Sequence, residues 1–288
     1  MHRPRRILVV CLGLVLLTPW AGRAWAAERP VRVVSQTVGS DELLLALARP
    51  EQVAALSHIA RESAFSAVAA EARQYPQITT AGDAESILRY APTLVLFADY
   101  SRAELIEQVR RAGVTVMIFD RYHTLGDSYD NLRRLAKELG AEARAEEVIA
   151  DCEARVRELR ERLTGRRPVR VLAPSTYGVI PGRATTFQDL CDHAAADNLA
   201  ASLGGLEGHV APPVERMLSW PIERVVLAGD SLDAQLALYR SVAPYQYLAA
   251  VREGRAVLLA PWQLSCVSHH RVWGYEQLAR ALHPEVFP

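Results

Sequence analysis

Polar and aromatic side chains follow the short apolar runs of this 288-residue chain. These runs end near positions 35, 57, 98 and 119 in the first half, and near 174, 229 and 261 in the second half. Open α/β sheets bind ligands at the carboxyl ends of their strands, so we expect these side chains to line one cleft. The candidate ligand-binding residues are Gln36, Thr37, His58, Tyr100, Tyr122, Tyr177, Trp262, His269 and His270, with Arg183 added below.

The candidate arginine and the histidines of the chain each allow more than one interpretation. Arg183, in the loop VIPGRATTF, suits an anionic ligand group because guanidinium pairs bidentately with carboxylates, although an exposed turn arginine explains it equally. His58 and His123 could bind a Zn²⁺ or Mn²⁺ ion directly, but no HxH or HxxxH spacing places two histidines on one element. We interpret His193, on a predicted helix, and His283 as structural or exposed.

The sequence contains no motif of a common catalytic site. GxSxG, HExxH, the P-loop and GxGxxG are all absent. A hydrolase that uses Asp99, Asp230 and a histidine is a weaker alternative, because the two carboxylates fall in different halves of the chain. We therefore expect a binding protein with no intrinsic cofactor.

Apolar runs rich in β-branched residues alternate with helical patterns along the chain. The runs are 31–35, 53–57, 93–98 and 114–119, then 169–174, 224–229 and 256–261. Such alternation is typical of βα units and parallel sheets. We therefore expect an α/β protein with two Rossmann-like lobes, each built on a central parallel sheet, and a ligand cleft between them.

Two segments share one pattern: AESILRYAPTLVLFAD at 84–99 and VERMLSWPIERVVLAGD at 214–230. Each has a glutamate, an apolar pair, an aromatic residue, a proline and an apolar run that ends at an aspartate. Glu85 and Glu215 are separated by 130 positions. The repeat predicts the same helix-to-strand step in two related lobes, with each glutamate at an exposed helix start.

The segment between the halves predicts one long helix. It lacks proline and spaces its apolar residues by three and four positions, which is typical of an amphipathic helix. The predicted organisation is a lobe at 27–141, a linker helix at 142–165 and a second lobe at 166–288.

The first residues resemble a secretory signal peptide. Arg3, Arg5 and Arg6 precede the apolar run at 7–17, and Ala24-Trp25-Ala26 fits a cleavage site, so residues 1–26 are predicted to be removed. A lipid anchor at Cys11 is disfavoured because that cysteine lies inside the apolar run.

Charge and cysteine content narrow the function further. Removing the four arginines of the signal leaves 29 basic against 33 acidic residues, a net charge of −4, which disfavours nucleic-acid binding. Cys152, Cys191 and Cys266 remain; a Cys191–Cys266 disulfide and buried free thiols are both open.

Several segments together resemble a known family. They are VVSQTVGSDELLLALA, AGDAESILRYAPTLVL, the single long helix, GRATTFQDLCDHAAADNLA, VERMLSWPIERVVL and YEQLARALHPEVF. In this order they are similar to the periplasmic solute-binding proteins of ABC importers for iron-siderophore, haem and vitamin B12 uptake. The resemblance covers essentially the whole chain after the signal.

The resemblance implies a periplasmic monomer that captures an iron chelate, haem or cobalamin and delivers it to a membrane permease with its ATPase. It implies that Glu85 and Glu215, one on each lobe, dock on arginines of the permease. Haem-binding members use tyrosine or histidine as axial ligands, so Tyr177, His58 and His269 become candidates. Direct Zn or Mn binding through His58 and His123 stays open as the alternative.

Overall fold

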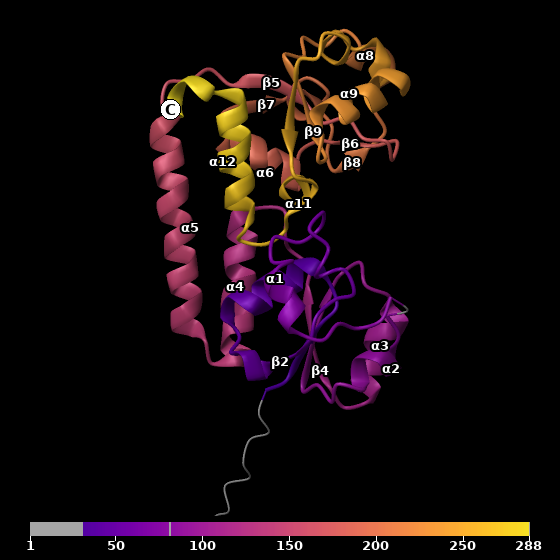
Figure 1. Ribbon diagram of the computed structural model, residues 1–288, viewed down its shortest axis with the longest axis vertical. Helices are drawn as coiled ribbons and strands as arrows, with labels where there is room; N and C mark the ends of the chain where they lie inside the picture. Colours follow the sequence, from indigo (N-terminus) through magenta and orange to yellow (C-terminus); the bar gives the residue numbers. More distant parts are fainter. Residues whose placement is uncertain (1–30, 81, 288) are drawn as a thin grey trace, which may run out of the picture.

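The computed structural model describes residues 31–80 and 82–287 of the chain (Figure 1). The predicted signal peptide at 1–26 and Cys11 lie outside the described residues. Among the helices that are described, none combines the length and the apolar character needed to cross a membrane.

The first half of the chain folds around a four-stranded parallel sheet in the order β2-β1-β3-β4. Its strands are almost continuously apolar and are mostly buried, as expected for a parallel sheet covered on both faces. The elements are β1 (Val33–Ser35), α1 (Val38–Leu47), η1 (Pro50–Gln52), β2 (Val53–Ala55), η2 (Glu71–Gln74), α2 (Ala84–Leu88), β3 (Leu94–Ala98), α3 (Ala103–Arg111), β4 (Thr115–Phe119) and α4 (Leu125–Leu139).

The second half folds around another four-stranded parallel sheet, in the order β10-β9-β5-β7. A short antiparallel pair, β6 with β8, lies beside it. The elements are β5 (Val169–Leu172), β6 (Ile180–Pro181), α6 (Thr186–His193), β7 (Ala196–Asn198), α7 (Leu199–Ser202), β8 (His209–Val210), α8 (Val214–Met217), β9 (Arg224–Ala228), α9 (Leu232–Ser241), η3 (Tyr245–Tyr247), α10 (Ala249–Arg252), β10 (Ala256–Leu259), α11 (Pro261–Ser265), α12 (Arg271–Leu282) and η4 (Pro284–Val286).

The two sheets have the same topology, which explains the sequence repeat. In each sheet the first strand lies between the second and the third, and the fourth strand is at an edge next to the third. AESILRYAPTLVLFAD forms α2 and β3, and VERMLSWPIERVVLAGD forms α8 and β9, which hold the same position in their sheets. The prediction of two related α/β lobes is confirmed.

A single long helix, α5 (Glu142–Arg162), connects the lobes and runs along one side of both (Figure 1). Its apolar residues divide between two cores: Ala145 and Ile149 pack with the first lobe, whereas Cys152, Val156 and Leu159 pack with the second. At about 1.5 Å per residue, its 21 residues span roughly 32 Å. The predicted boundaries at 27–141, 142–165 and 166–288 stay predictions.

Paired arginine and glutamate side chains hold α5 to its neighbours. Arg133 of α4 donates two hydrogen bonds to Glu146, at 2.7 and 2.9 Å. Arg155 of α5 donates two to Glu276 of α12, both at 2.9 Å. A helix packed along its length against both lobes limits hinge motion, because bending it would need a proline, glycine or bulge.

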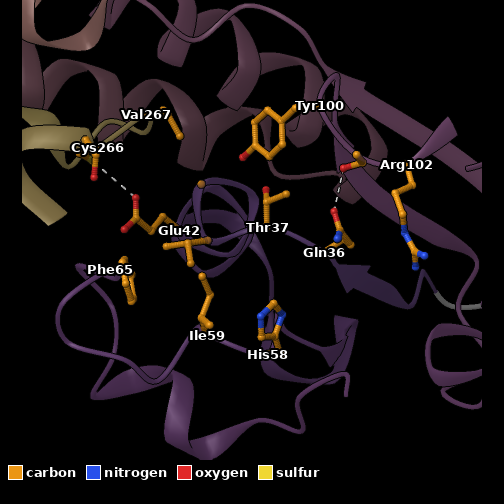
Figure 2. Close-up of a pocket in the computed structure, with 14 residues that line it drawn as sticks. Gln36, Thr37, Glu42, His58, Ile59, Phe65, Tyr100, Arg102, Cys266 and Val267 are labelled. Atoms are coloured by element: carbon orange, nitrogen blue, oxygen red, sulfur yellow. Dashed lines mark hydrogen bonds between the residues drawn. The ribbon is translucent and has the colours of Figure 1, made fainter. Parts of the chain in front are cut away.

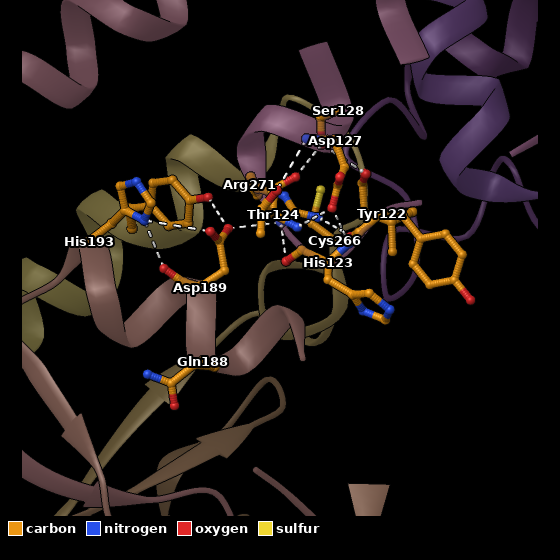
Figure 3. A network of polar contacts seen from close by, with 12 residues as sticks. Tyr122, His123, Thr124, Asp127, Ser128, Gln188, Asp189, His193, Cys266 and Arg271 are labelled. Atoms are coloured by element: carbon orange, nitrogen blue, oxygen red, sulfur yellow. Dashed lines mark hydrogen bonds and ion pairs between the residues drawn. The ribbon is translucent and has the colours of Figure 1, made fainter. Parts of the chain in front are cut away.

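The start of α12 and the turn before it make a second, buried connection between the lobes (Figure 3). The Arg271 side chain, 1% exposed, donates to the carbonyls of Tyr122 and His123 in the first lobe, at 2.7 and 2.8 Å. It also pairs with Asp189 of α6 at 2.8 Å. Ser128 of α4 donates to the Val267 carbonyl at 3.1 Å. These contacts join β4–α4, α6 and α12 into one buried polar cluster.

Candidate functional site

Two adjoining pockets lie between the lobes, near the carboxyl ends of the strands. The first has a volume of about 390 Å³ and the second about 540 Å³. Phe65 of the first lobe and Ser265 of the second line both pockets, so the two pockets adjoin in the cleft between the lobes.

The first pocket brings together four of the predicted ligand-binding residues (Figure 2). Gln36 and Thr37 follow β1, His58 follows β2, and Tyr100 follows β3. These strands are neighbours in the sheet, so their carboxyl ends meet at one edge, as the sequence predicted.

Local hydrogen bonds fix the polar residues of this pocket. The Thr37 hydroxyl caps α1 by accepting from the Ser40 N–H, and the Ser40 hydroxyl accepts from the Thr37 N–H. The Gln36 side chain accepts from the Ser101 hydroxyl at 2.8 Å. The pocket wall therefore rests on a capped helix and on the turn after β3.

Tyr100 presents a largely exposed phenol to the first pocket. Tyr100 is 66% exposed as a residue, and its ring meets Tyr122 edge-on, with 6.2 Å between ring centroids. Burial, followed by the hydrogen bond to Asp99 at 3.0 Å, raises the pKa of Tyr122 to about 12. Tyr122 is thus a neutral support for Tyr100 and does not itself line either pocket.

The second pocket is mainly apolar and carries Tyr177, whose side chain is 91% exposed. Tyr239, edge-on to Tyr245, holds its wall by donating to the Pro174 carbonyl at 3.1 Å. Burial and the nearby His123 lower the pKa of His209, which keeps this lining residue neutral near neutral pH. The other residues that line the second pocket include Ala173, Val179, Phe187, Leu238 and Leu264.

Five predicted ligand-binding residues line neither pocket: Tyr122, described above, and Arg183, Trp262, His269 and His270. Arg183 is exposed beside the β6–β8 pair and donates to the Gly205 carbonyl at 3.4 Å. Trp262, His269 and His270 instead form an aromatic cluster with Trp273, against α5. Burial of the largely apolar indole rings favours this packed position over an open cleft.

His269 is the clearest case, because its ring is buried in this aromatic cluster. Burial lowers the pKa of His269 to about 3 and that of His270 to about 4. The Cys152 thiol of α5 donates to the His269 carbonyl at 3.8 Å. A haem-ligand role for His269 is therefore unsupported, and the segment SCVSHH contributes Ser265, Cys266 and Val267 to the first pocket in place of its histidines.

Glu42, Phe65 and Arg102 are lining residues that the sequence reasoning missed. Glu42 lies in DELLLALA, where a carboxylate pair at the head of an apolar helix was the available signal. Phe65 belongs to the irregular segment after β2, for which the sequence carries no periodic pattern.

The structure also bears on the alternatives of direct metal binding and of a disulfide. No three His, Cys, Asp or Glu side chains within 31–80 and 82–287 come close enough to hold a metal ion, so neither His58 nor His123 belongs to such a group there. Cys152, Cys191 and Cys266 are buried free thiols, so Cys191 and Cys266 are not paired.

Glu85 and Glu215 are both exposed, in the first turns of α2 and α8. Both helices lie on the side of the molecule away from α5 (Figure 1). Docking through these two residues stays a prediction.

Comparison with known proteins agrees with this architecture. The periplasmic heme-binding protein of Pseudomonas aeruginosa is 23% identical, with 89% of this chain and 94% of that chain covered at a TM-score of 0.74. The periplasmic heme-binding protein HutB of Vibrio cholerae is 18% identical, covering 88% and 99% at 0.73. A possible iron-binding protein of Staphylococcus epidermidis is 15% identical, covering 88% and 98% at 0.73. At these identities the likeness concerns the fold.

No curated protein matches the sequence. The family model described as periplasmic binding protein, however, matches residues 33–261, which is more than half of the chain. The protein therefore belongs to the periplasmic binding protein family, whose members bind solutes and are not enzymes.

Proposed function

We propose that this protein captures haem, or a similar planar iron or cobalt chelate, in the periplasm and delivers it to an ABC importer. The observation that carries the proposal is the aromatic lining of the cleft. Phe65, Tyr100 and Tyr177 are 56%, 66% and 91% exposed and line the two adjoining pockets. Exposed aromatic groups in a concave site favour stacking on a flat, apolar ligand.

The same cleft offers side chains that can ligate iron. The His58 imidazole is exposed in the first pocket and the Tyr177 phenol in the second. Histidine and tyrosine are both protein ligands of haem iron. The volumes of about 390 and 540 Å³ fall within the roughly 300–1,000 Å³ typical of small-molecule sites.

The charge of the lining favours a ligand with few negative groups. Among the residues that line the two pockets, Arg102 is the only arginine or lysine, and it donates to the Gly82 carbonyl at 2.9 Å. A tris-catecholate iron complex, which carries several negative charges, would need more compensating cations than this lining has. Haem and corrinoids, with an extended apolar face, fit the lining better.

Three related proteins support the transport role by analogy. Two are heme-binding proteins and one is described as possibly iron-binding. In our proposal Glu85 and Glu215 contact arginines of the permease, which works with its ATPase. The predicted signal peptide accounts for export to the periplasm.

The test is titration of the ligand-free protein with haemin, cobalamin, a ferric hydroxamate and a ferric tris-catecholate, followed by absorbance and by quenching of tyrosine and tryptophan fluorescence. We expect haemin or cobalamin to bind with a Kd of about 1 μM or lower, equivalent to roughly −8 kcal/mol. Binding of the tris-catecholate alone would overturn the choice of ligand. Binding of none of the four would overturn the proposed function.

A further inference from the structure

Two adjacent carboxylates at the head of α1, Asp41 and Glu42, are buried behind the first pocket. They are 0% and 2% exposed. Each accepts hydrogen bonds from neutral donors, and no arginine or lysine pairs with either within the described part of the chain. Burying charge without a cationic partner costs free energy, so such a pair is a poor device for stability.

Asp41 holds the residue next to His58. Its Oδ1 accepts from the Ser57 N–H at 3.0 Å, and its Oδ2 accepts from the Ser57 hydroxyl at 2.5 Å. Ser57 lies just beyond the end of β2, so these two bonds determine where the chain leaves the sheet. The position of His58 in the pocket depends on that exit.

Glu42 holds two further parts of the pocket wall. Its Oε1 accepts from the Ala67 N–H at 2.9 Å, two residues after Phe65. Its Oε2 accepts from the Ser268 hydroxyl at 2.5 Å and from the Cys266 thiol at 3.6 Å, a contact visible in Figure 2. One carboxylate thus joins the first lobe's pocket segment to the turn before α12.

The segment held by these carboxylates has little regular structure of its own. Between β2 and η2 it consists of turns, and it supplies His58, Ile59 and Phe65 to the pocket. An irregular segment keeps its shape only through the groups that anchor its backbone, because it has no helix or strand ladder. Asp41 and Glu42 provide anchors at both ends of the pocket-lining stretch.

We propose that Asp41 and Glu42 are positioning residues for the ligand site: they hold the segment from Ser57 to Ala67 in its binding shape, and they do so best as carboxylates. The proposal deepens the proposed function and rests on it for the ligand. A carboxylate accepts charge-assisted hydrogen bonds, which are roughly twice as strong as neutral ones. A protonated Asp41 would have to use one oxygen as a donor, and the Ser57 hydroxyl bond would be reorganised.

Protonation of Asp41 is accessible near neutral pH. Burial, opposed by the hydrogen bonds from Ser35 and Ser57, raises the pKa of Asp41 to about 7. Burial also raises the pKa of Glu42, against the hydrogen bond from Ser268. Because the folded pKa of Asp41 exceeds its ordinary value, ionisation destabilises the folded state as pH rises toward about 7. Ligand affinity should show the opposite pH dependence from folding stability. It should fall toward lower pH, as Asp41 takes up a proton.

The groups that face the pair are few and can be separated. Asp41 interacts electrostatically with Glu42 and with the Tyr100 phenol, and His58 is the residue after Ser57. Arg271 and Cys266 interact with Glu42.

The experiment measures haemin affinity from about pH 8 to about pH 6 in the wild-type chain, Asp41→Asn, Glu42→Gln and Ser57→Ala, with Asp233→Asn as an exposed Asp-to-Asn control. Wild-type affinity should fall about fivefold toward the lower pH, the difference between a charge-assisted and a neutral hydrogen bond. Asp41→Asn should show the weaker affinity at both pH values, and the control should match wild type. Persistence of the full pH effect in Asp41→Asn would assign the effect to another group and overturn the proposal.

A ligand-independent measurement separates this inference from the proposed function. Hydrogen exchange of amides 59–67, corrected for intrinsic rates, should be faster at the lower pH in wild type and uniformly fast in Asp41→Asn. Ser57→Ala, which keeps the carboxylate but loses one donor, should also accelerate it. Equal exchange in wild type and all three variants would overturn the positioning role. If the exchange rates differ as expected but haemin does not bind, the result would count only against the choice of ligand.

Discussion

Replacing Arg271 by methionine should destabilise this protein more than any single change at an exposed arginine. The side chain is 1% exposed and donates to Asp189, to Tyr122 and His123 and, at 3.3 Å, to the Ser268 carbonyl. Methionine would leave a buried Asp189 carboxylate without its cation and several carbonyls without a donor.

The expected magnitude follows from that loss. Removing one partner of a buried ion pair costs about 3–5 kcal/mol, because the remaining charge stays buried. In a protein of this size each kcal/mol lowers Tm by about 2–4 °C, so Arg271→Met should melt roughly 6–20 °C below wild type. The same substitution at Arg110, which pairs with Glu107 on the surface of α3, should cost at most about 1 kcal/mol.

The assay is thermal and urea unfolding of wild type, Arg271→Met, Asp189→Asn and the double variant, with Arg110→Met as the control. Since the two residues share one ion pair, the double variant should be less destabilised than the sum of the single variants. Strict additivity, or an Arg271→Met variant that melts with the control, would refute the reasoning that Arg271 and Asp189 form a stabilising buried ion pair.

Three further predictions concern the ligand and the partner. Reversing charge at Glu85 and Glu215 together should abolish transport by the reconstituted importer while haemin affinity stays unchanged; reduced haemin binding in this variant would count against docking. Titration with haemin should show that Tyr177→Phe keeps most of the stacking energy, whereas Tyr177→Ala loses about 0.5–1.5 kcal/mol of it. If the Tyr177 phenol ligates the iron, the absorbance spectrum of bound haemin should change in Tyr177→Phe. His269→Phe removes a buried Nδ1 that has no hydrogen-bond partner, so Tm should hold or rise with haemin affinity unchanged; a loss of affinity would return His269 to the ligand site.

Much of the fold could be predicted because its signals are local. The helix at 103–111 and its end at Gly113, which has a φ of 77°, follow from apolar spacing and from a residue that tolerates the left-handed conformation. Thr185 caps α6 as its residue type favours. Strand β7, by contrast, is Ala196–Asn198, with no β-branched or aromatic residue. Its pairing with β5 comes from tertiary context, which the residue types of this segment do not indicate.

The site was predictable in part for the same reason. Gln36, Thr37, His58 and Tyr100 each lie within three residues of the end of a strand, and parallel strands bring such positions together. Glu42 and Phe65 reach the pocket through a helix face and an irregular segment, whose directions depend on the neighbours they pack against.

The sequence by itself determined the two-lobe α/β architecture, the long connecting helix and the repeated glutamate segments, since periodicity and strand order are encoded over short distances. Only the tertiary structure decided which side of the turn before α12 faces the cleft. There Cys266 and Val267 point to the first pocket, while His269 packs against α5 and Arg271 against the first lobe. Neighbouring residues in a turn point in different directions, and the packing of distant elements selects among them.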